Sequence, residues 1–226
     1  MIPLKTRGIS LMLKAVVVLA AAAGVYLSAR AASAAFMGGG RVFMFFTIQS
    51  NILVALLSLA GAVFLLKRSP AGSVWPVIKF AGTVSITLTG AVFTFILAPT
   101  MGGTAWSTRN VLTHVVVPAA AIIDFFVTGI YCDIKKSSVF YAILPPAAYA
   151  AYAGIGYAAG WEFAAGVNYP YFFLDWGSPA GAFGFSGELP FMGCVWWILA
   201  LLALLIIVGY VYLLMIDGIK KIIKKR

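Results

Sequence analysis

The chain alternates between long apolar blocks and short segments that are rich in glycine, proline and charge. About 20 apolar residues in a helix cross roughly 30 Å of hydrocarbon, and six blocks reach that length. The predicted spans are Ile9–Ala31, Val42–Leu66, Val77–Ala98, Val111–Tyr131, Val139–Ala159 and Leu189–Ile216. The pattern therefore predicts an all-α, polytopic membrane protein, in which residues 1–226 form a single six-helix bundle.

Two places depart from this simple pattern. Pro145 and Pro146 fall inside the fifth span, where proline removes a backbone donor, so we expect a kink or a break there. The only long connection runs from about Gly160 to Glu188 and contains many aromatic residues. Aromatic side chains beside a span favour the headgroup level, which is where we expect these to lie.

Composition excludes a water-soluble domain. Apolar residues make up 63% of the chain and charged residues 10%. A soluble surface of this size carries far more charge. The two cysteines, Cys132 and Cys194, fall at opposite ends of their spans, so a membrane separates them and excludes an intrachain disulfide.

The net charge of +10 is distributed unevenly. Thirteen of the 16 basic residues fall on one side of a six-span topology. These are Lys5, Arg7, Lys14, Lys67, Arg68, Lys79, Lys135, Lys136, Lys220, Lys221, Lys224, Lys225 and Arg226. Basic residues in short loops stay cytoplasmic, so both termini are predicted to be cytoplasmic, with the protein in the cell membrane.

The basic tail IKKIIKKR is best interpreted as an anchor on anionic lipid headgroups at the cytoplasmic face. This distribution argues against a nucleic-acid partner. The first span leaves two interpretations, because Ala29–Ala35 resembles a signal-peptidase site. The length of the apolar run favours a retained helix over a cleaved signal peptide. The sequence does not indicate an oligomeric state.

His114 is the only histidine, and it lies inside the fourth span. An ionisable residue at membrane depth marks a functional site by default. Thr47 lies in the second span, which runs in the same direction. Both residues are about four or five positions past the outer end of their spans, which places both roughly 6–9 Å below the outer boundary. Equal depth makes a contact between them possible.

A hydroxyl beside a neutral imidazole is a nucleophile and its general base. Threonine needs such a base, because its hydroxyl is inert at its own pKa. An acyl intermediate would also need hydrogen-bond donors for its oxyanion. The candidate donors are Asn51, Asn110 and Arg109. The chemistry alone leaves a structural histidine equally open.

No carboxylate is placed beside His114 by the sequence. Asp124 follows it by about 15 Å along the same helix, too far to orient the ring. Asp175 or Glu162 would have to fold in from the long outer segment. Tyr149 and Tyr152 on the kinked fifth span are candidates to line a channel for a lipid tail, although packing is the more common role.

Three segments resemble one family of six-pass membrane proteins. They are FFTIQSNILVAL (Phe45–Leu56), TRNVLTHVVVPAAAIIDF (Thr108–Phe125) and YPYFFLDW (Tyr169–Trp176). The family contains androgen-induced-gene and ADTRP-like threonine hydrolases and a bacterial six-pass branch, to which this chain is more similar. The resemblance implies a catalytic pair at Thr47 and His114, and hydrolysis of fatty-acid esters of hydroxy fatty acids.

The first hypothesis is therefore an intramembrane lipid-ester hydrolase that needs neither a cofactor nor a metal. The alternative is a lipid or small-molecule transporter, or a non-catalytic membrane scaffold, in which His114 lines a path. Transporters place ionisable groups near the midplane, where Asp124 is the only deep acid, and often contain inverted repeats. No repeat is visible here. Haem is disfavoured because one histidine supplies one axial ligand.

Overall fold

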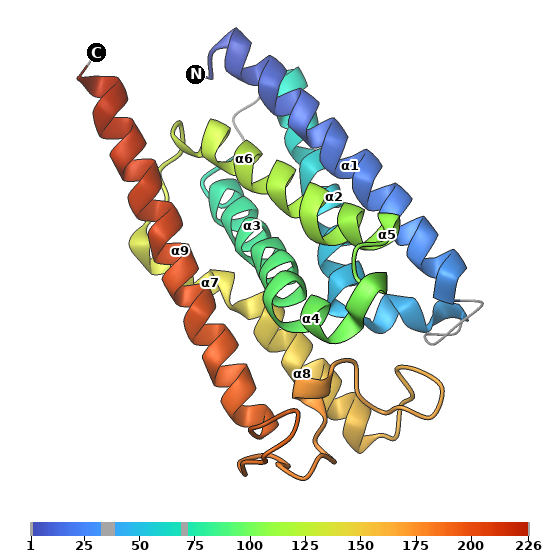
Figure 1. Cartoon of the computed structure of the whole chain (residues 1–226). Coiled ribbons are helices and arrows are strands. Elements are labelled where there is room, and N and C mark those ends of the chain that lie inside the picture. The colour runs from blue at the N-terminus through green and yellow to red at the C-terminus, as the bar shows by residue number, and fades with distance from the viewer. Residues whose placement is uncertain (1, 33–38, 69–71, 226) are drawn as a thin grey trace.

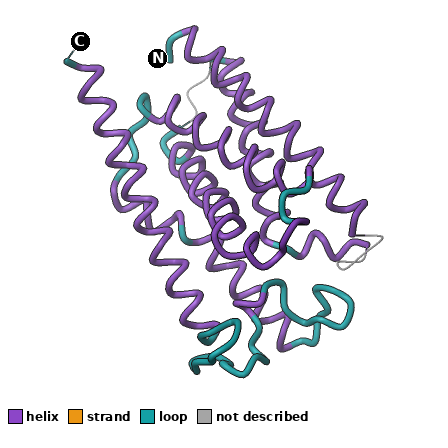
Figure 2. Tube along the Cα trace, in the orientation of Figure 1, coloured by secondary structure: helices purple, strands orange, loops and turns teal. Residues whose placement is uncertain are grey.

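The computed structural model describes residues 2–32, 39–68 and 72–225, and these residues form helices and loops without a β-strand (Figure 2). Six of the helical segments are long and apolar enough to cross a membrane. The predicted all-α, six-helix membrane architecture is thus confirmed. The residues 33–38, which include the last three residues of the signal-peptidase-like stretch, lie outside the described residues.

Three spans are continuous helices and three are composite. The continuous ones are α1 (Leu4–Ala32), α2 (Phe46–Lys67) and α9 (Cys194–Lys224). The third span joins α3 (Trp75–Val92), the π-helix η2 (Phe93–Leu97), α4 (Ala98–Met101) and η3 (Gly102–Thr104). The fourth joins α5 (Thr108–Val111), the π-helix η4 (Leu112–Val116) and α6 (Val117–Gly129). The fifth joins η5 (Lys136–Ser138), α7 (Val139–Ala142) and α8 (Leu144–Ala158).

The predicted break in the fifth span is present. Ile143 separates α7 from α8, and the two prolines begin α8. Proline is tolerated in the first turn of a helix because its missing N–H has no intrahelical acceptor there. The prolines therefore start a new helix after the break. The predicted boundary of the sixth span was wrong, because residues 189–193 are loop and the basic tail continues α9 to Lys224.

The helices pack in two groups that share α3 (Figure 1). On one side, α1, α2, α3 and α6 form a ring in which each helix contacts its two neighbours. On the other side, α7, α8 and α9 pack against α3. Phe80, Val84 and Leu88 of α3 are buried in the largest apolar cluster together with Phe125 and Leu205. Close contacts on both sides make α3 the central helix.

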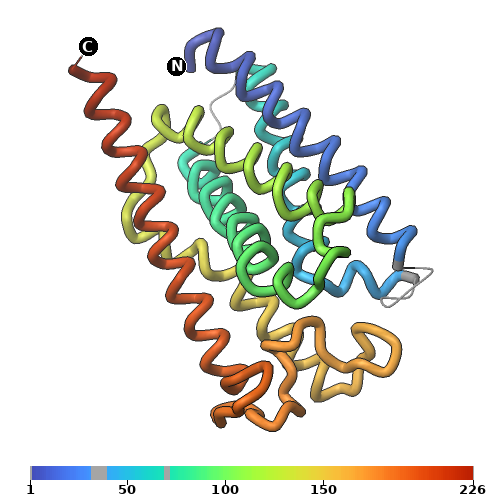
Figure 3. The backbone as a smooth tube through the Cα atoms, viewed as in Figure 1, coloured from blue at the N-terminus to red at the C-terminus, as the bar shows by residue number. Residues whose placement is uncertain are grey.

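The two ends of the bundle differ. Both termini lie at one end, here called the terminal end, and the long connection between α8 and α9 folds beneath the opposite end, here called the loop end (Figures 1 and 3). The aromatic residues of this connection divide between the surface and the core, and their position at the headgroup level stays a prediction. Phe183 and Phe185 are exposed, but Phe163 and Phe173 are buried. The connection folds back onto the helices, so part of its aromatic content joins the core.

Candidate functional site

The structure brings Thr47 and His114 together near the loop end of the bundle. Thr47 lies in the first turn of α2 and His114 lies in the π-helix η4. The Thr47 Oγ1 atom is 3.2 Å from His114 Nε2. The contact that equal depth made possible is therefore confirmed, while the catalytic role of the pair stays a prediction.

A local irregularity in each of two helices positions the imidazole. His114 belongs to η4, and Phe93, which begins the π-helix η2, stacks on the imidazole with ring centroids 3.9 Å apart and planes at 19°. Single π-helical turns widen a helix and are frequent at functional sites. Gly90 lets the third span approach this turn, since a Cβ there would lie 3.0 Å from the His114 carbonyl oxygen.

The hydrogen bonds of the ring fix its tautomer. His114 Nδ1 lies 3.0 Å from the Asn110 carbonyl oxygen, which can only accept a hydrogen bond. The Thr113 hydroxyl, also 3.0 Å from Nδ1, donates its own proton to the Arg109 carbonyl oxygen. Nδ1 therefore carries the proton of the neutral ring, and Nε2 is left as an acceptor for the Thr47 hydroxyl. A backbone carbonyl thus orients the ring where a triad would use a carboxylate.

The other predicted site residues are distributed as follows. Asn51 is fully buried, and its amide nitrogen donates to the carbonyl oxygens of Thr47 at 2.7 Å and Thr113 at 3.1 Å. Both amide hydrogens of Asn51 are thus engaged, so it joins the two helices and has no hydrogen left for an oxyanion. The Asn110 amide donates to the Ala105 carbonyl oxygen.

The charged candidates make no contact with the pair. Asp175 accepts a hydrogen bond from the Gly177 N–H, and Glu162 forms an ion pair with Arg41 at 2.6 Å. Within the described residues, no hydrogen bond or ion pair links Asp175, Glu162 or the Arg109 side chain to His114.

Tyr171 is the residue that sequence reasoning missed. It lies in the long connection just before η6 (Phe172–Leu174), and its hydroxyl accepts a hydrogen bond from the Thr47 N–H at 3.2 Å. The first backbone N–H groups of a helix lack intrahelical partners, so Tyr171 satisfies one of them in α2. The same hydroxyl is 3.5 Å from Thr47 Oγ1. Burial raises the pKa of the Tyr171 phenol above its ordinary value, which keeps it protonated at neutral pH.

An apolar pocket opens beside Thr47, between α2, α3, α8, α9 and the long connection, and the space inside it is about 580 Å³ including its open mouth. Thr47, Thr89, Tyr149 and Tyr171 are the only lining residues with a side-chain hydroxyl. The remaining lining residues are Phe46, Leu88, Val92, Leu97, Pro146, Ala150, Phe173, Leu174, Ile198, Leu201 and Leu202. Tyr149 therefore lies where a channel residue was predicted. Tyr152 does not line the pocket and instead packs on Tyr149 and Trp161.

No group of three or more histidine, cysteine, aspartate or glutamate side chains that could hold a metal ion occurs within residues 2–32, 39–68 and 72–225. The chain matches no protein-family model, no curated protein and no solved structure. The family resemblance of the three segments therefore remains an expectation, and the chemistry of the site has to be judged from its geometry.

Proposed function

We propose that this protein is an intramembrane lipid-ester hydrolase, with Thr47 as nucleophile and His114 as general base. The observation that carries the proposal is the 3.2 Å separation of Thr47 Oγ1 and His114 Nε2, in the tautomer that accepts the hydroxyl proton. A nucleophile within hydrogen-bond reach of a base that a third group orients is the arrangement of covalent hydrolases.

The reaction would proceed in two halves. The Thr47 oxygen attacks the ester carbonyl carbon while His114 Nε2 takes the hydroxyl proton. The tetrahedral intermediate collapses, the His114 Nε2–H protonates the leaving alkoxide, and an acyl-threonine remains. A water molecule, deprotonated by Nε2, then attacks the acyl carbonyl. As the second tetrahedral intermediate collapses, Nε2–H returns the proton to Thr47 Oγ1 and the carboxylic acid leaves.

Tyr171 supplies the oxyanion donor in this scheme. Its oxygen accepts the Thr47 N–H, and its own proton, which can bond Thr47 Oγ1 at 3.5 Å in the resting site, would turn toward a developing oxyanion next to Thr47. A neutral phenol held in a water-poor site is an effective donor, because the surroundings screen the interaction little. The donor assigned here thus replaces Asn51, whose amide is occupied by backbone carbonyls.

The pocket favours an acyl chain as the neighbour of the reacting ester. Its walls are mostly aliphatic and aromatic side chains, which suits a hydrocarbon tail. An ester carbonyl of a membrane amphiphile lies near the headgroup boundary, the depth at which Thr47 lies if the loop end faces the outer leaflet. Fatty-acid esters of hydroxy fatty acids fit this description, and the cytoplasmic orientation of both termini in the cell membrane belongs to the same proposal. The basic tail of α9 would then contact anionic headgroups.

The test uses the full chain purified in detergent micelles. Long-chain fatty-acid esters of hydroxy fatty acids serve as substrates, and a fluorophosphonate probe labels the nucleophile. We expect Thr47→Ala and His114→Ala to abolish turnover and labelling, and Thr47→Ser to retain both in part. Thr83→Ala is the matched control, because the Thr83 hydroxyl bonds only a carbonyl of its own helix. Turnover at the parental rate in both Thr47→Ala and His114→Ala would refute the proposal.

A further inference from the structure

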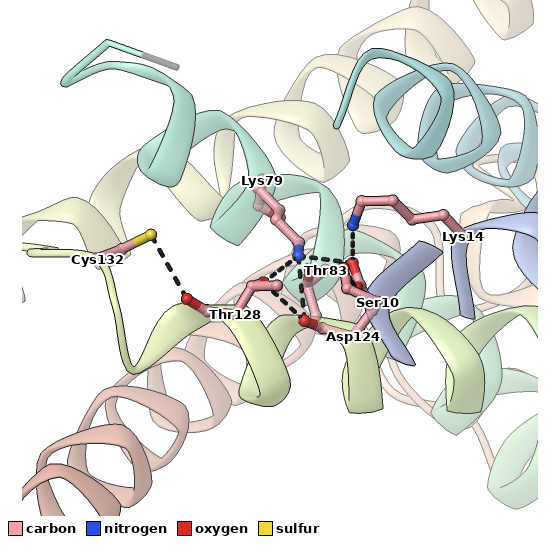
Figure 4. Close-up of polar contacts among 7 residues, drawn as sticks. All are labelled: Ser10, Lys14, Lys79, Thr83, Asp124, Thr128 and Cys132. Atoms are coloured by element: carbon pink, nitrogen blue, oxygen red, sulfur yellow. Dashed lines mark hydrogen bonds and ion pairs between the residues drawn. The ribbon is translucent and has the colours of Figure 1, made fainter. Parts of the chain in front are cut away.

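A second polar group lies away from Thr47, near the terminal end. Asp124 of α6 accepts hydrogen bonds from Ser10 and Lys14 of α1, and its Oδ2 atom lies 2.6 Å from Lys79 Nζ of α3 (Figure 4). Lys79 Nζ also donates to the Thr128 hydroxyl at 2.6 Å and to the Asp124 carbonyl oxygen at 3.1 Å. Three helices of the ring therefore meet at one carboxylate.

The charges of this group do not balance. Two ammonium groups share one carboxylate, and neither lysine forms an ion pair with any other acid within the described residues. Lys14 is 4% exposed and Asp124 is 3% exposed, while the Lys79 side chain is 16% exposed. A buried charge without a counter-charge is strongly unfavourable, so the surplus cation is expected to have an anionic partner.

Both lysines face a cavity that such a partner would fill. The cavity, here called the terminal cavity, encloses about 2370 Å³ including its open mouth. Five cationic residues and one acidic residue line it: Arg7, Lys14, Arg68, Lys79, Lys135 and Asp133. Arg7 carries a separate indication of a missing ligand, because its Nε atom is buried and has no hydrogen-bond partner among the described residues.

We propose that the terminal cavity binds a phosphate group, held by hydrogen bonds from Arg7 and Lys14 and by the charge of Lys79. Arginine and lysine together are the usual partners of phosphate oxygens. Phe64, Trp75 and Phe125 give the cavity apolar walls as well. A phospholipid headgroup and a free phosphate ion share the chemistry that this site recognises.

The site is distinct from the proposed hydrolytic centre. Asp124 follows His114 by ten positions on the same span, which corresponds to about 15 Å. No residue lines both the terminal cavity and the pocket beside Thr47. A phosphate site in the terminal cavity therefore does not depend on ester hydrolysis at Thr47.

The experiment measures thermal unfolding of the detergent-purified full chain by intrinsic tryptophan fluorescence. Three probes are titrated at constant ionic strength set with potassium chloride: inorganic phosphate, dihexanoyl-phosphatidic acid, and dihexanoylglycerol, which has the same tails without phosphate. A ligand that binds the folded state raises the unfolding temperature with concentration. We expect a rise with one or both phosphate probes and none with dihexanoylglycerol. A response to phosphatidic acid alone identifies a lipid site, and a response to both probes identifies a site for free phosphate.

The variants separate binding from folding. Lys79→Met leaves Lys14 and Asp124 as a balanced pair, and Arg7→Gln removes a group whose Nε atom has no partner, so both should fold. Loss of one cationic partner of the phosphate should weaken its binding roughly tenfold to hundredfold. Lys221→Met, which removes the same charge from the exposed part of α9, should leave binding unchanged. No response to either phosphate probe, or equal responses in all three variants, would overturn the proposal.

Discussion

Thr47 and His114 are 67 positions apart in the chain, yet the hydroxyl oxygen of one lies 3.2 Å from the Nε2 atom of the other. The contact depends on the start of α2 and on the π-helical turn η4, which come from different spans. Three backbone carbonyl groups support this contact. The Asn110 carbonyl orients the imidazole ring, and the Asn51 side-chain amide links the two helices by donating to the carbonyls of Thr47 and Thr113.

Removal of the Tyr171 hydroxyl tests the oxyanion assignment. Tyr171→Phe should lower kcat about 10²- to 10³-fold, the typical effect of removing one oxyanion donor, with little change in KM. Tyr169→Phe is the matched control, since the Tyr169 hydroxyl has no hydrogen bond among the described residues. Steady-state kinetics on a fatty-acid ester measure both constants. An unchanged kcat in Tyr171→Phe would leave Tyr171 with only the structural role of capping α2.

The close approach of α3 to η4 can be tested at Gly90. A Cβ at this position would lie 3.0 Å from the His114 carbonyl oxygen and 3.3 Å from Pro118 Cβ. Gly90→Ala should therefore destabilise the fold by about 1–3 kcal/mol and displace the imidazole. Gly218→Ala, with no atom within 4 Å of the added carbon, should be neutral or stabilising by about 1 kcal/mol. Thermal unfolding and ester turnover of the two variants give the comparison, and equal behaviour would contradict it.

The fold was predictable because the bilayer demands long apolar helices, and six of them are visible in the sequence. The depth argument also allowed the contact between Thr47 and His114 that the structure shows, since a helix converts position into depth at a fixed rise. The sequence carries no pattern that predicts the two π-helical turns, which are visible only in the structure, where Phe93 and His114 on different spans stack. Tyr171 was missed for a related reason. Its segment was interpreted as interfacial, whereas the loop folds back so that the hydroxyl reaches Thr47.

The carboxylates of the loop end should be dispensable for catalysis. Asp175 bonds the Gly177 N–H, and Glu162 forms its ion pair with Arg41 where both side chains are largely exposed. Asp175→Asn and Glu162→Gln should keep the parental rate of ester hydrolysis. The loss of the exposed ion pair should change stability by less than about 1 kcal/mol. A large fall in kcat for Asp175→Asn would mean that the long connection rearranges to bring this acid to His114.

Substitution of Asp124 distinguishes the proposed hydrolase from the competing hypothesis of a transporter. Asp124→Asn leaves Lys14 and Lys79 without their counter-charge, and breaking a buried pair in this way typically costs about 3–5 kcal/mol. The double variant Asp124→Asn with Lys14→Met should recover part of that loss. Ester turnover per folded molecule should be unchanged, because Asp124 makes no contact with the pair. Transport in liposomes that survives Thr47→Ala but is lost in Asp124→Asn would favour a transporter.

Cys132 reports which side of the membrane the terminal end faces. It follows α6, and burial raises the pKa of its thiol above the ordinary value. A raised pKa means less thiolate at neutral pH, so maleimide labelling should be slow at pH 7 and accelerate as the pH rises. With both termini cytoplasmic, a membrane-impermeant maleimide at pH 8.5 should label permeabilised cells and leave intact cells unlabelled. Cys132→Ser should lose the label, and Cys194→Ser should keep it, because Cys194 is fully buried. Labelling of Cys132 in intact cells would reverse the proposed orientation and move the Thr47 site to the cytoplasmic leaflet.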